Sequence, residues 1–161
     1  MGLSNIEVKK MNRNSVLQYM LKVEGGSKNS IAEALHLSIP TIAQSLRELE
    51  EVGLIREGAM LDSIGGRRAK SYQCVKDAKL AIGLDITQNH VNAVMINLSK
   101  QIVYTARKRM RIHPQEESYR ELQAVIREVI DKSGAREEQI LGLGTSLPAI
   151  IDDTGTKIYA L

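Results

Sequence analysis

The spacing of the apolar residues changes near residue 76, and this change constrains the fold more than any other feature of the sequence. Before it, apolar residues recur mostly at helical intervals. After it, three consecutive segments have the pattern of β-strands. With 161 residues, the chain is long enough for two small domains. The sequence therefore predicts an α+β chain with one domain over residues 1–76 and a second over residues 77–161.

Two helices are predicted at the start of the first domain. The first spans about residues 12–24, where apolar residues share one helical face, and it ends at Gly25. Ser27 or Ser30 can cap the second helix, and residues 30–33 fit the capping-box pattern of a serine followed three positions later by a glutamate. His36 follows in a tight turn, where it is expected to tolerate a left-handed backbone.

A third helix and a hairpin complete the predicted first domain. The helix spans about residues 39–52, because Ser38 is a good N-cap and Pro40 in the first turn has no hydrogen bond to lose. Two strands at residues 54–57 and 69–75 then form a hairpin. Three short helices followed by a hairpin are typical of a winged helix-turn-helix.

The third helix is predicted to be the element that contacts DNA. Ile42, Leu46 and Leu49 share its buried face, and the outer face has polar donors at its N-terminal end. Its C-terminal end has glutamates that a phosphate backbone would repel, namely Glu48, Glu50 and Glu51. Only the N-terminal end is therefore expected to enter a groove, where Gln44 can pair with adenine and Arg47 can reach a guanine or a phosphate. The candidate DNA-binding residues on this helix and its cap are Ser38, Pro40, Thr41, Gln44, Ser45 and Arg47.

The tip of the hairpin has further basic residues. Arg67, Arg68 and Lys70 lie beside Gly65 and Gly66, and such a flexible basic tip suits the minor groove or the phosphates. Residues 1–76 have 11 basic and 8 acidic side chains, whereas residues 77–161 have 11 of each, so the whole net charge of +3 lies in the predicted DNA-binding domain. Aromatic residues make up only 3%, which disfavours a stacking platform for single-stranded nucleic acid.

The second domain is predicted to be a meander followed by a helix and a further strand. The expected elements are strands at residues 80–86, 91–98 and 101–110, a helix at about residues 116–132 and a strand at residues 140–145. Together they would form a three-stranded antiparallel meander, an amphipathic helix and one more strand.

Four segments together resemble a known family. They are Ser-Ile-Ala-Glu at residues 30–33, the run at residues 37–55, Gly-Gly-Arg-Arg at residues 65–68, and Ile-Gly-Leu-Asp-Ile at residues 82–86. This set resembles the ROK family (repressors, open reading frames, kinases), and within it the sugar-responsive repressors of bacteria. The resemblance implies a winged helix joined to part of a sugar-kinase-like lobe of the actin/hexokinase fold. It also implies that a sugar or sugar phosphate changes the affinity for an operator.

The chain departs from the family pattern at two motifs. The family kinases have a glycine-rich turn that approaches ATP phosphates, but Thr87 and Gln88 replace both glycines here. Asp85 is therefore a weak candidate for a degenerate phosphate turn, and a structural aspartate that closes the turn is the preferred interpretation. Residues 142–152 resemble a family segment near the sugar site, with Ala149 in place of a glycine, and a packing role is expected for them.

The family's catalytic aspartate, sugar-binding residues and zinc motif all lie beyond the segment that corresponds to residue 161. We therefore expect a shortened form of such a protein, with no catalytic, cofactor-binding or metal-binding residues of its own, and a sugar effector only in a full-length form. Cys74 is the only cysteine, which excludes an intrachain disulfide and a cysteine-rich zinc site.

The leading hypothesis is a bacterial transcriptional regulator, a repressor of carbohydrate-use genes that binds double-stranded operator DNA as a homodimer. A cytoplasmic, nucleoid-associated location is expected, because no apolar run approaches the roughly 18–20 residues that cross a bilayer and the N-terminus lacks the apolar core of a signal peptide. The alternative is a sugar kinase or ATP-binding protein of the same family. A third hypothesis makes residues 77–161 an association module that pairs two chains.

Overall fold

The computed structural model describes residues 4–61, 69–111, 113, 115–155 and 158–160. It divides into two compact units, Met1–Ala78 and Lys79–Leu161. The boundary thus falls two residues after the position suggested by the change in apolar spacing. Each unit has its own cluster of buried apolar side chains.

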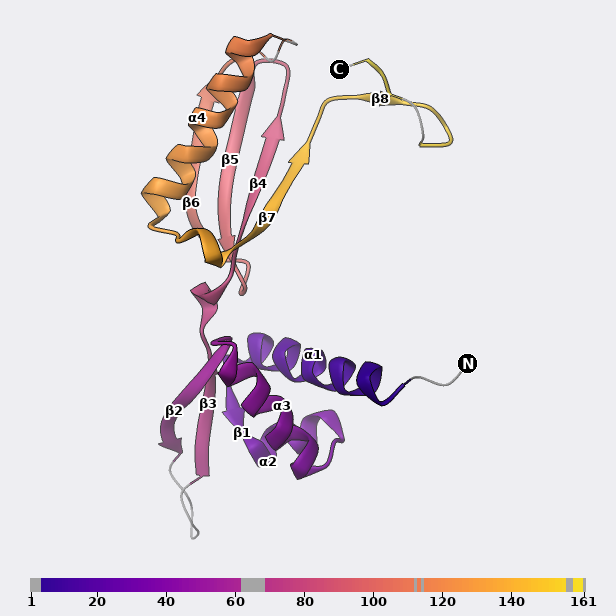
Figure 1. The fold of residues 1–161 in the computed structure, drawn as a ribbon, viewed down its shortest axis with the longest axis vertical. Helices are drawn as coiled ribbons and strands as arrows, with labels where there is room; N and C mark the ends of the chain where they lie inside the picture. The colour runs from indigo at the N-terminus through magenta and orange to yellow at the C-terminus, as the bar shows by residue number, and fades with distance from the viewer. Residues whose placement is uncertain (1–3, 62–68, 112, 114, 156–157, 161) are drawn as a thin grey trace. The chain divides into compact units, whose positions relative to one another are not determined.

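The first unit consists of three helices and a small antiparallel sheet (Figure 1). Its elements are α1 (Asn5–Val23), β1 (Gly26–Ser27), α2 (Lys28–Leu35), α3 (Ile39–Glu51), β2 (Ile55–Leu61), β3 (Ala69–Cys74) and the 3-10 helix η1 (Lys76–Ala78). The strand order is β1-β3-β2. This arrangement is a winged helix-turn-helix, as the sequence predicted. The short strand β1, which the sequence did not reveal, adds a third strand to the predicted hairpin.

Helix α1 begins seven residues earlier than the apolar spacing predicted. The Ser4 hydroxyl accepts a hydrogen bond from the backbone N–H of Glu7 (3.3 Å), and the Glu7 carboxylate accepts one from the backbone N–H of Ser4 (2.7 Å). This capping box starts the helix in a stretch where residues 5–11 are all exposed. Apolar periodicity fails there because the first turns pack against nothing in the core.

The structure decides between the two serines that could cap α2. Ser27 is the N-cap, because its hydroxyl accepts from the backbone N–H of Ser30 (3.1 Å) and the Ser30 hydroxyl accepts from the backbone N–H of Ser27 (3.0 Å). Ser30 is therefore already inside the helix, and the predicted capping box at residues 30–33 is wrong. At the other end, His36 has the expected left-handed backbone, with φ 52°.

Helix α3 is confirmed almost to the residue. Ser38 is its N-cap and accepts a hydrogen bond from the backbone N–H of Thr41 (3.3 Å), and Pro40 lies in the first turn. The faces are also as expected, since the apolar face of α3 belongs to the core of the unit. That core consists of Val16, Met20, Ile31, Ala32, Ile42, Leu46, Leu49, Ile55 and Tyr72.

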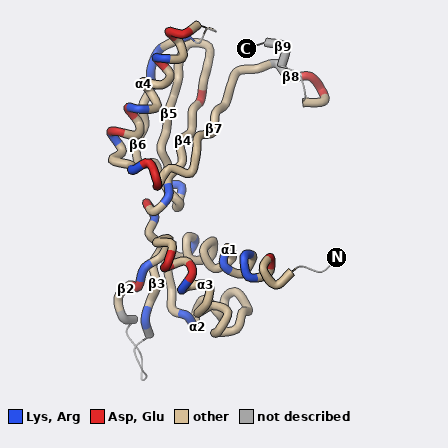
Figure 2. Tube along the Cα trace, viewed as in Figure 1, with Lys and Arg blue, Asp and Glu red and all other residues tan. Residues whose placement is uncertain are grey.

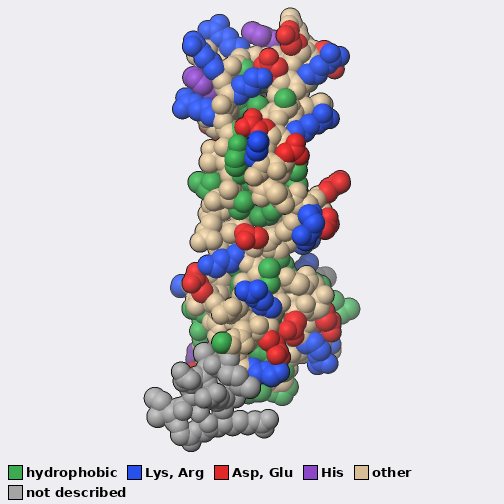
Figure 3. All heavy atoms as spheres, turned by 90° about the vertical axis from the view of Figure 1, so that its left-hand side faces the viewer, with side chains coloured by type: hydrophobic (Ala, Val, Ile, Leu, Met, Phe, Trp, Pro, Cys, Tyr) green, Lys and Arg blue, Asp and Glu red, His purple; other side chains and the backbone are tan. Residues whose placement is uncertain are grey.

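The second unit is a four-stranded sheet with one long helix across one face (Figure 1). Its elements are β4 (Leu80–Ile86), β5 (His90–Asn97), β6 (Ile102–Arg109), α4 (Glu116–Ser133), the 3-10 helix η2 (Glu137–Gln139), β7 (Ile140–Ser146), β8 (Ile150–Ile151) and β9 (Ile158–Ala160). The sheet order is β6-β5-β4-β7, with the predicted meander antiparallel and β7 parallel to β4. A space-filling view shows Lys and Arg side chains gathered beside His at one end of this unit (Figure 3).

Residues 142–152 were expected to have a packing role. Those of them whose side chains are described do not show one within this chain. All side chains of residues 141–148 are exposed, including Leu141 (65%) and Leu143 (46%). The reason is that α4 packs on β5 and β6, whereas β7 forms the opposite edge of the sheet, away from that helix.

Candidate nucleic-acid interface

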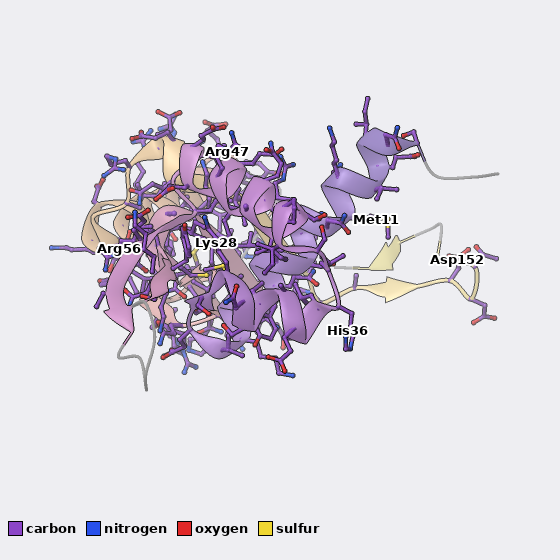
Figure 4. The ribbon with its side chains drawn as sticks, turned by 90° about the horizontal axis from the view of Figure 1, so that it is seen from below. Met11, Lys28, His36, Arg47, Arg56 and Asp152 are labelled. Carbon is purple, nitrogen blue, oxygen red and sulfur yellow. The ribbon has the colours of Figure 1, made fainter. Side chains whose placement is uncertain are left out.

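The outer face of α3 presents the predicted polar donors to solvent. Pro40, Gln44 and Arg47 are exposed and Thr41 is half-buried. Arg47 lies at the surface of the first unit, as does His36 at the end of α2 (Figure 4). Most of the predicted contact residues on α3 are therefore accessible on one surface.

Two of the predicted serines have other roles. Ser38 is committed to capping α3, and its Oγ lies 2.8 Å from Thr41 Oγ1. Ser45 is only 4% exposed, so little of it is accessible for the expected DNA contact. Ser45 is buried because it lies on the side of α3 that faces α1, a packing contact that a helical wheel of α3 alone cannot show.

A groove of about 290 Å³ runs between α1 and α3. It is lined by Lys9 and Asn12 from α1 and by Pro40, Thr41, Gln44, Ser45 and Glu48 from α3. The basic residues of the N-terminal half of α1 can be followed in Figure 2. Lys9 and Asn12 thus border the predicted DNA-contacting surface, although apolar spacing placed them outside or at the start of the helix. The capping box at Ser4 and Glu7 was the signal that could have found them.

A chain of polar contacts connects the two helices. Arg47 Nη2 donates to Gln44 Oε1 (2.7 Å), Gln44 Nε2 donates to Glu48 Oε1 (2.8 Å), and Arg13 Nη1 donates to Glu48 Oε2 (3.3 Å). We call these four residues the α1–α3 network. The hydrogen bond from Gln44 lowers the pKa of Glu48, and Arg13 and Lys9 act in the same direction.

The α1–α3 network changes the interpretation of the acidic end of α3. Glu48 was expected simply to repel a phosphate backbone, but Arg13 balances its charge. Glu50 and Glu51 are exposed, and within the described part of the chain neither forms an ion pair. Repulsion of phosphate is therefore expected mainly from the last turn of α3.

Only one of the predicted wing residues lies in the described part of the chain. The tip at residues 65–68, with Arg67 and Arg68, lies outside it. Lys70 Nζ donates to both carboxylate oxygens of Glu57 (2.8 and 2.9 Å), and this contact raises the pKa of Lys70. Lys70 would have to exchange Glu57 for a phosphate in order to bind DNA.

The turn after β4 is closed by a threonine rather than by an aspartate. Thr87 Oγ1 donates to the backbone oxygen of His90 (2.9 Å), and the Thr87 backbone N–H donates to the same oxygen (2.8 Å). Asp85 instead accepts from Ser146 Oγ (2.6 Å) and from Asn92 Nδ2 (3.1 Å), which lowers its pKa. Asp85 therefore connects three strands, and the expectation that it closes the turn is corrected.

The described residues also bear on metal binding and on membrane insertion. Within them, no three His, Cys, Asp or Glu side chains are close enough together to hold a metal ion. None of the described helices is both long and apolar enough to cross a bilayer.

Comparison with known proteins links the first unit to a DNA-binding family. Residues 15–56 match the family described as "winged helix-turn-helix DNA-binding". The matched stretch runs from within α1 to the start of β2 and so includes α3 and part of the α1–α3 groove.

Several known proteins are similar in sequence to nearly the whole of this chain. A "putative xylose repressor" of a Caldicellulosiruptor species is 26% identical over 95% of this chain and 39% of its own length. The "xylose repressor" of Bacillus subtilis is 24% identical over 90% of this chain and 38% of its own length. The "DNA-binding transcriptional dual regulator NagC" of Escherichia coli is 25% identical over 98% of this chain and 39% of its own length. The chain thus spans about two-fifths of the length of these relatives.

A solved structure shares the fold of this chain. The crystal structure of a ROK family transcriptional regulator, described as a homologue of the Escherichia coli MLC protein, superposes with a TM-score of 0.64 at 18% identity, covering 89% of this chain and 37% of that one. The chain is thus similar to sugar repressors over nearly its whole length, and residues 15–56 match a winged helix-turn-helix DNA-binding family.

Proposed function

We propose that this chain is the DNA-binding part of a sequence-specific transcriptional regulator, a repressor of carbohydrate-use genes. The N-terminal end of α3 would enter the major groove of double-stranded operator DNA. The repressors among its relatives support this proposal. Because the chain spans only about two-fifths of their length, a sugar or sugar-phosphate effector is proposed only for a full-length form.

One observation supports DNA binding more than any other. Helix α3 packs into the core through one side and on the other exposes Pro40 and Gln44 toward its N-terminal end, with Arg47 about one turn further on. Helix-turn-helix domains bind the major groove with this end of the second helix of the motif. In this arrangement Arg47 can donate two hydrogen bonds to guanine, and Gln44 can pair with adenine.

The first helix adds positive charge beside this surface. Lys9 lines the groove with Gln44, and Lys10 follows it on α1. Within the described residues neither lysine forms an ion pair, so both are available to phosphates. Contacts of this kind position a protein on the duplex without selecting its sequence.

The proposal is tested by selection from a library of duplexes with a random core of about 20 base pairs, about two turns of B-DNA. Fluorescence anisotropy then measures affinity for the selected duplex. We expect a preferred sequence, an affinity that falls steeply with salt, and a loss of about 1–3 kcal/mol of base discrimination in Arg47→Ala. Arg127→Ala, which removes an exposed arginine from α4, is the matched control. Failure to enrich any sequence would count against the proposal.

We propose in addition that the regulator acts as a homodimer in the bacterial cytoplasm, associated with the nucleoid. Helix-turn-helix dimers bind two half-sites about one turn of DNA apart, so a homodimer predicts that the selected sequence is palindromic. The edge strand β6, with Ile102 65% exposed, is one surface through which residues 77–161 could associate. Mass measurement in solution, with and without the selected duplex, tests the stoichiometry.

The alternative function, sugar kinase or ATP binding, has less support. Both carboxylate oxygens of Asp85 accept hydrogen bonds from neighbouring strands, and the backbone N–H of Thr87 is used within the turn. These contacts favour a structural role for the segment that the resemblance compared with a phosphate turn. Calorimetry with Mg-ATP tests the alternative, and tight binding would support it.

A further inference from the structure

We propose that the Arg13–Glu48 ion pair positions the side chains of Gln44 and Arg47, so that the base specificity of α3 depends on a residue of α1 that contacts no base. This inference rests on the proposed DNA binding and adds two positioning residues to it. From the sequence alone, Glu48 was assigned only to repulsion of phosphate, and no role was assigned to Arg13.

The contacts form one continuous path from the core-anchored part of α1 to the outer face of α3. Arg13 lies one turn before Val16, which is fully buried in the core of the unit. Its guanidinium donates to one oxygen of Glu48, and Gln44 donates to the other. Gln44 then accepts from Arg47. Arg47 is therefore connected to two helices rather than to its own helix alone.

The carboxylate of Glu48 also sets the direction of the Gln44 amide. An ionised carboxylate only accepts hydrogen bonds, so it faces the NH₂ group of Gln44 and turns the carbonyl oxygen toward Arg47. The guanidinium has five N–H donors, and this contact uses one of them. Arg47 thus keeps donors for a guanine edge while its orientation is restrained.

Restraint of this kind affects specificity because long side chains lose rotamer freedom when they bind. Ordering a flexible glutamine or arginine opposes binding, and a side chain that is already oriented loses less. The α1–α3 network orients both groups before DNA arrives. Without Glu48, Arg47 could still attract phosphate, but it would sample many orientations over the bases.

Charge and geometry make opposite predictions for removal of Glu48. If Glu48 only repels phosphate, Glu48→Gln and Glu51→Gln should both tighten binding to all sequences, with unchanged base preference. If Glu48 positions Gln44 and Arg47, Glu48→Gln should weaken base preference and Glu51→Gln should not. Glu51 is the matched control because it is a glutamate on the same helix that is exposed and outside the network.

The test uses the full 161-residue chain and the random-core duplex library, followed by anisotropy on the selected duplex and on duplexes with single base-pair changes. We expect Glu48→Gln to lower the preference at the base pair that Arg47 contacts by about tenfold, within the range for one good bidentate contact. Equal base preferences in Glu48→Gln and Glu51→Gln would overturn the inference. If the unaltered chain enriched no sequence, the proposed function itself would fail instead.

Changes at Arg13 separate positioning from folding. Arg13→Gln removes the charge that anchors Glu48, and we expect the same loss of base preference, whereas Arg13→Lys should restore part of it. A purely structural role would weaken binding to matched and mismatched duplexes in parallel and would lower the thermal midpoint. Such a parallel loss in Arg13→Gln, with the preference ratio unchanged, would contradict the positioning role.

Discussion

Gly25 joins α1 to the sheet of the first unit, and its replacement by alanine should destabilise that unit strongly. Its φ is +134°, a backbone conformation that side-chain-bearing residues rarely adopt and that costs of order 1–3 kcal/mol. An added Cβ would also collide with the backbone oxygen of Tyr72 on β3. Backbone atoms cannot move aside as a flexible side chain can. We therefore expect Gly25→Ala to lower the free energy of unfolding by about 3–4 kcal/mol, near the upper end of the range for ordinary substitutions.

This magnitude can be checked by calorimetry on the full chain, with hydrogen exchange to assign the transition to the first unit. That unit has 78 residues, and a domain of this size shifts its midpoint by about 4–8 °C per kcal/mol, so Gly25→Ala should lower it by about 12 °C or more. Gly53→Ala is the matched control: its φ is +70°, but among the described residues, its two chain neighbours aside, no atom lies within 4 Å of an added Cβ. Gly53→Ala should lower the free energy of unfolding by about 1–2 kcal/mol. Equal midpoints for the two variants would refute the collision.

Three further outcomes are expected. The double change Arg67→Ala/Arg68→Ala should reduce the magnitude of the log–log salt slope of DNA binding by about 2, and an unchanged slope would remove these residues from the phosphate contacts. The hydrogen bond from Ser146 lowers the pKa of Asp85 below its ordinary value of 3.8. The stabilisation that the Asp85 carboxylate contributes is therefore fully present above pH 3.8 and is lost as pH falls through the lowered pKa. Acid unfolding followed by circular dichroism should show the unaltered chain losing its stability advantage over Asp85→Asn at low pH. Burial raises the pKa of the Cys74 thiol, so at neutral pH it should react with a disulfide reagent more slowly than free cysteine does.

The parts of the fold that the sequence predicted well are those whose signals are local. Helix α3 has a serine cap at Ser38, a proline in its first turn, and apolar residues at helical spacing, and all three indicate the same boundaries. The first turns of α1 lack apolar periodicity because they lie outside the core, so only the Ser4 cap marked them. The parallel pairing of β7 with β4 follows a long connection through α4, and no local pattern specifies it.

The candidate site was predicted in outline but not in its contacts. A helical wheel identifies the outer face of α3, yet the burial of Ser45 depends on which side α1 covers. The Arg13–Glu48 pair joins residues 35 positions apart, a separation at which sequence spacing carries no information about contact. For the same reason Glu48 was grouped with Glu50 and Glu51, although its environment differs from theirs.

The distribution of ion pairs, more than the net charge, indicates where DNA would bind. In the described part of the first unit, carboxylates pair with Arg13, Lys70 and Lys76. The other described cations of that unit are Lys9, Lys10, Lys22, Lys28, Arg47 and Arg56. Of these, Lys9 lines the α1–α3 groove and Arg47 is hydrogen-bonded to Gln44 in the same groove. An excess of only three charges can therefore still favour a polyanion, because Lys9 and Arg47, which form no ion pair among the described residues, lie beside the groups that can recognise bases.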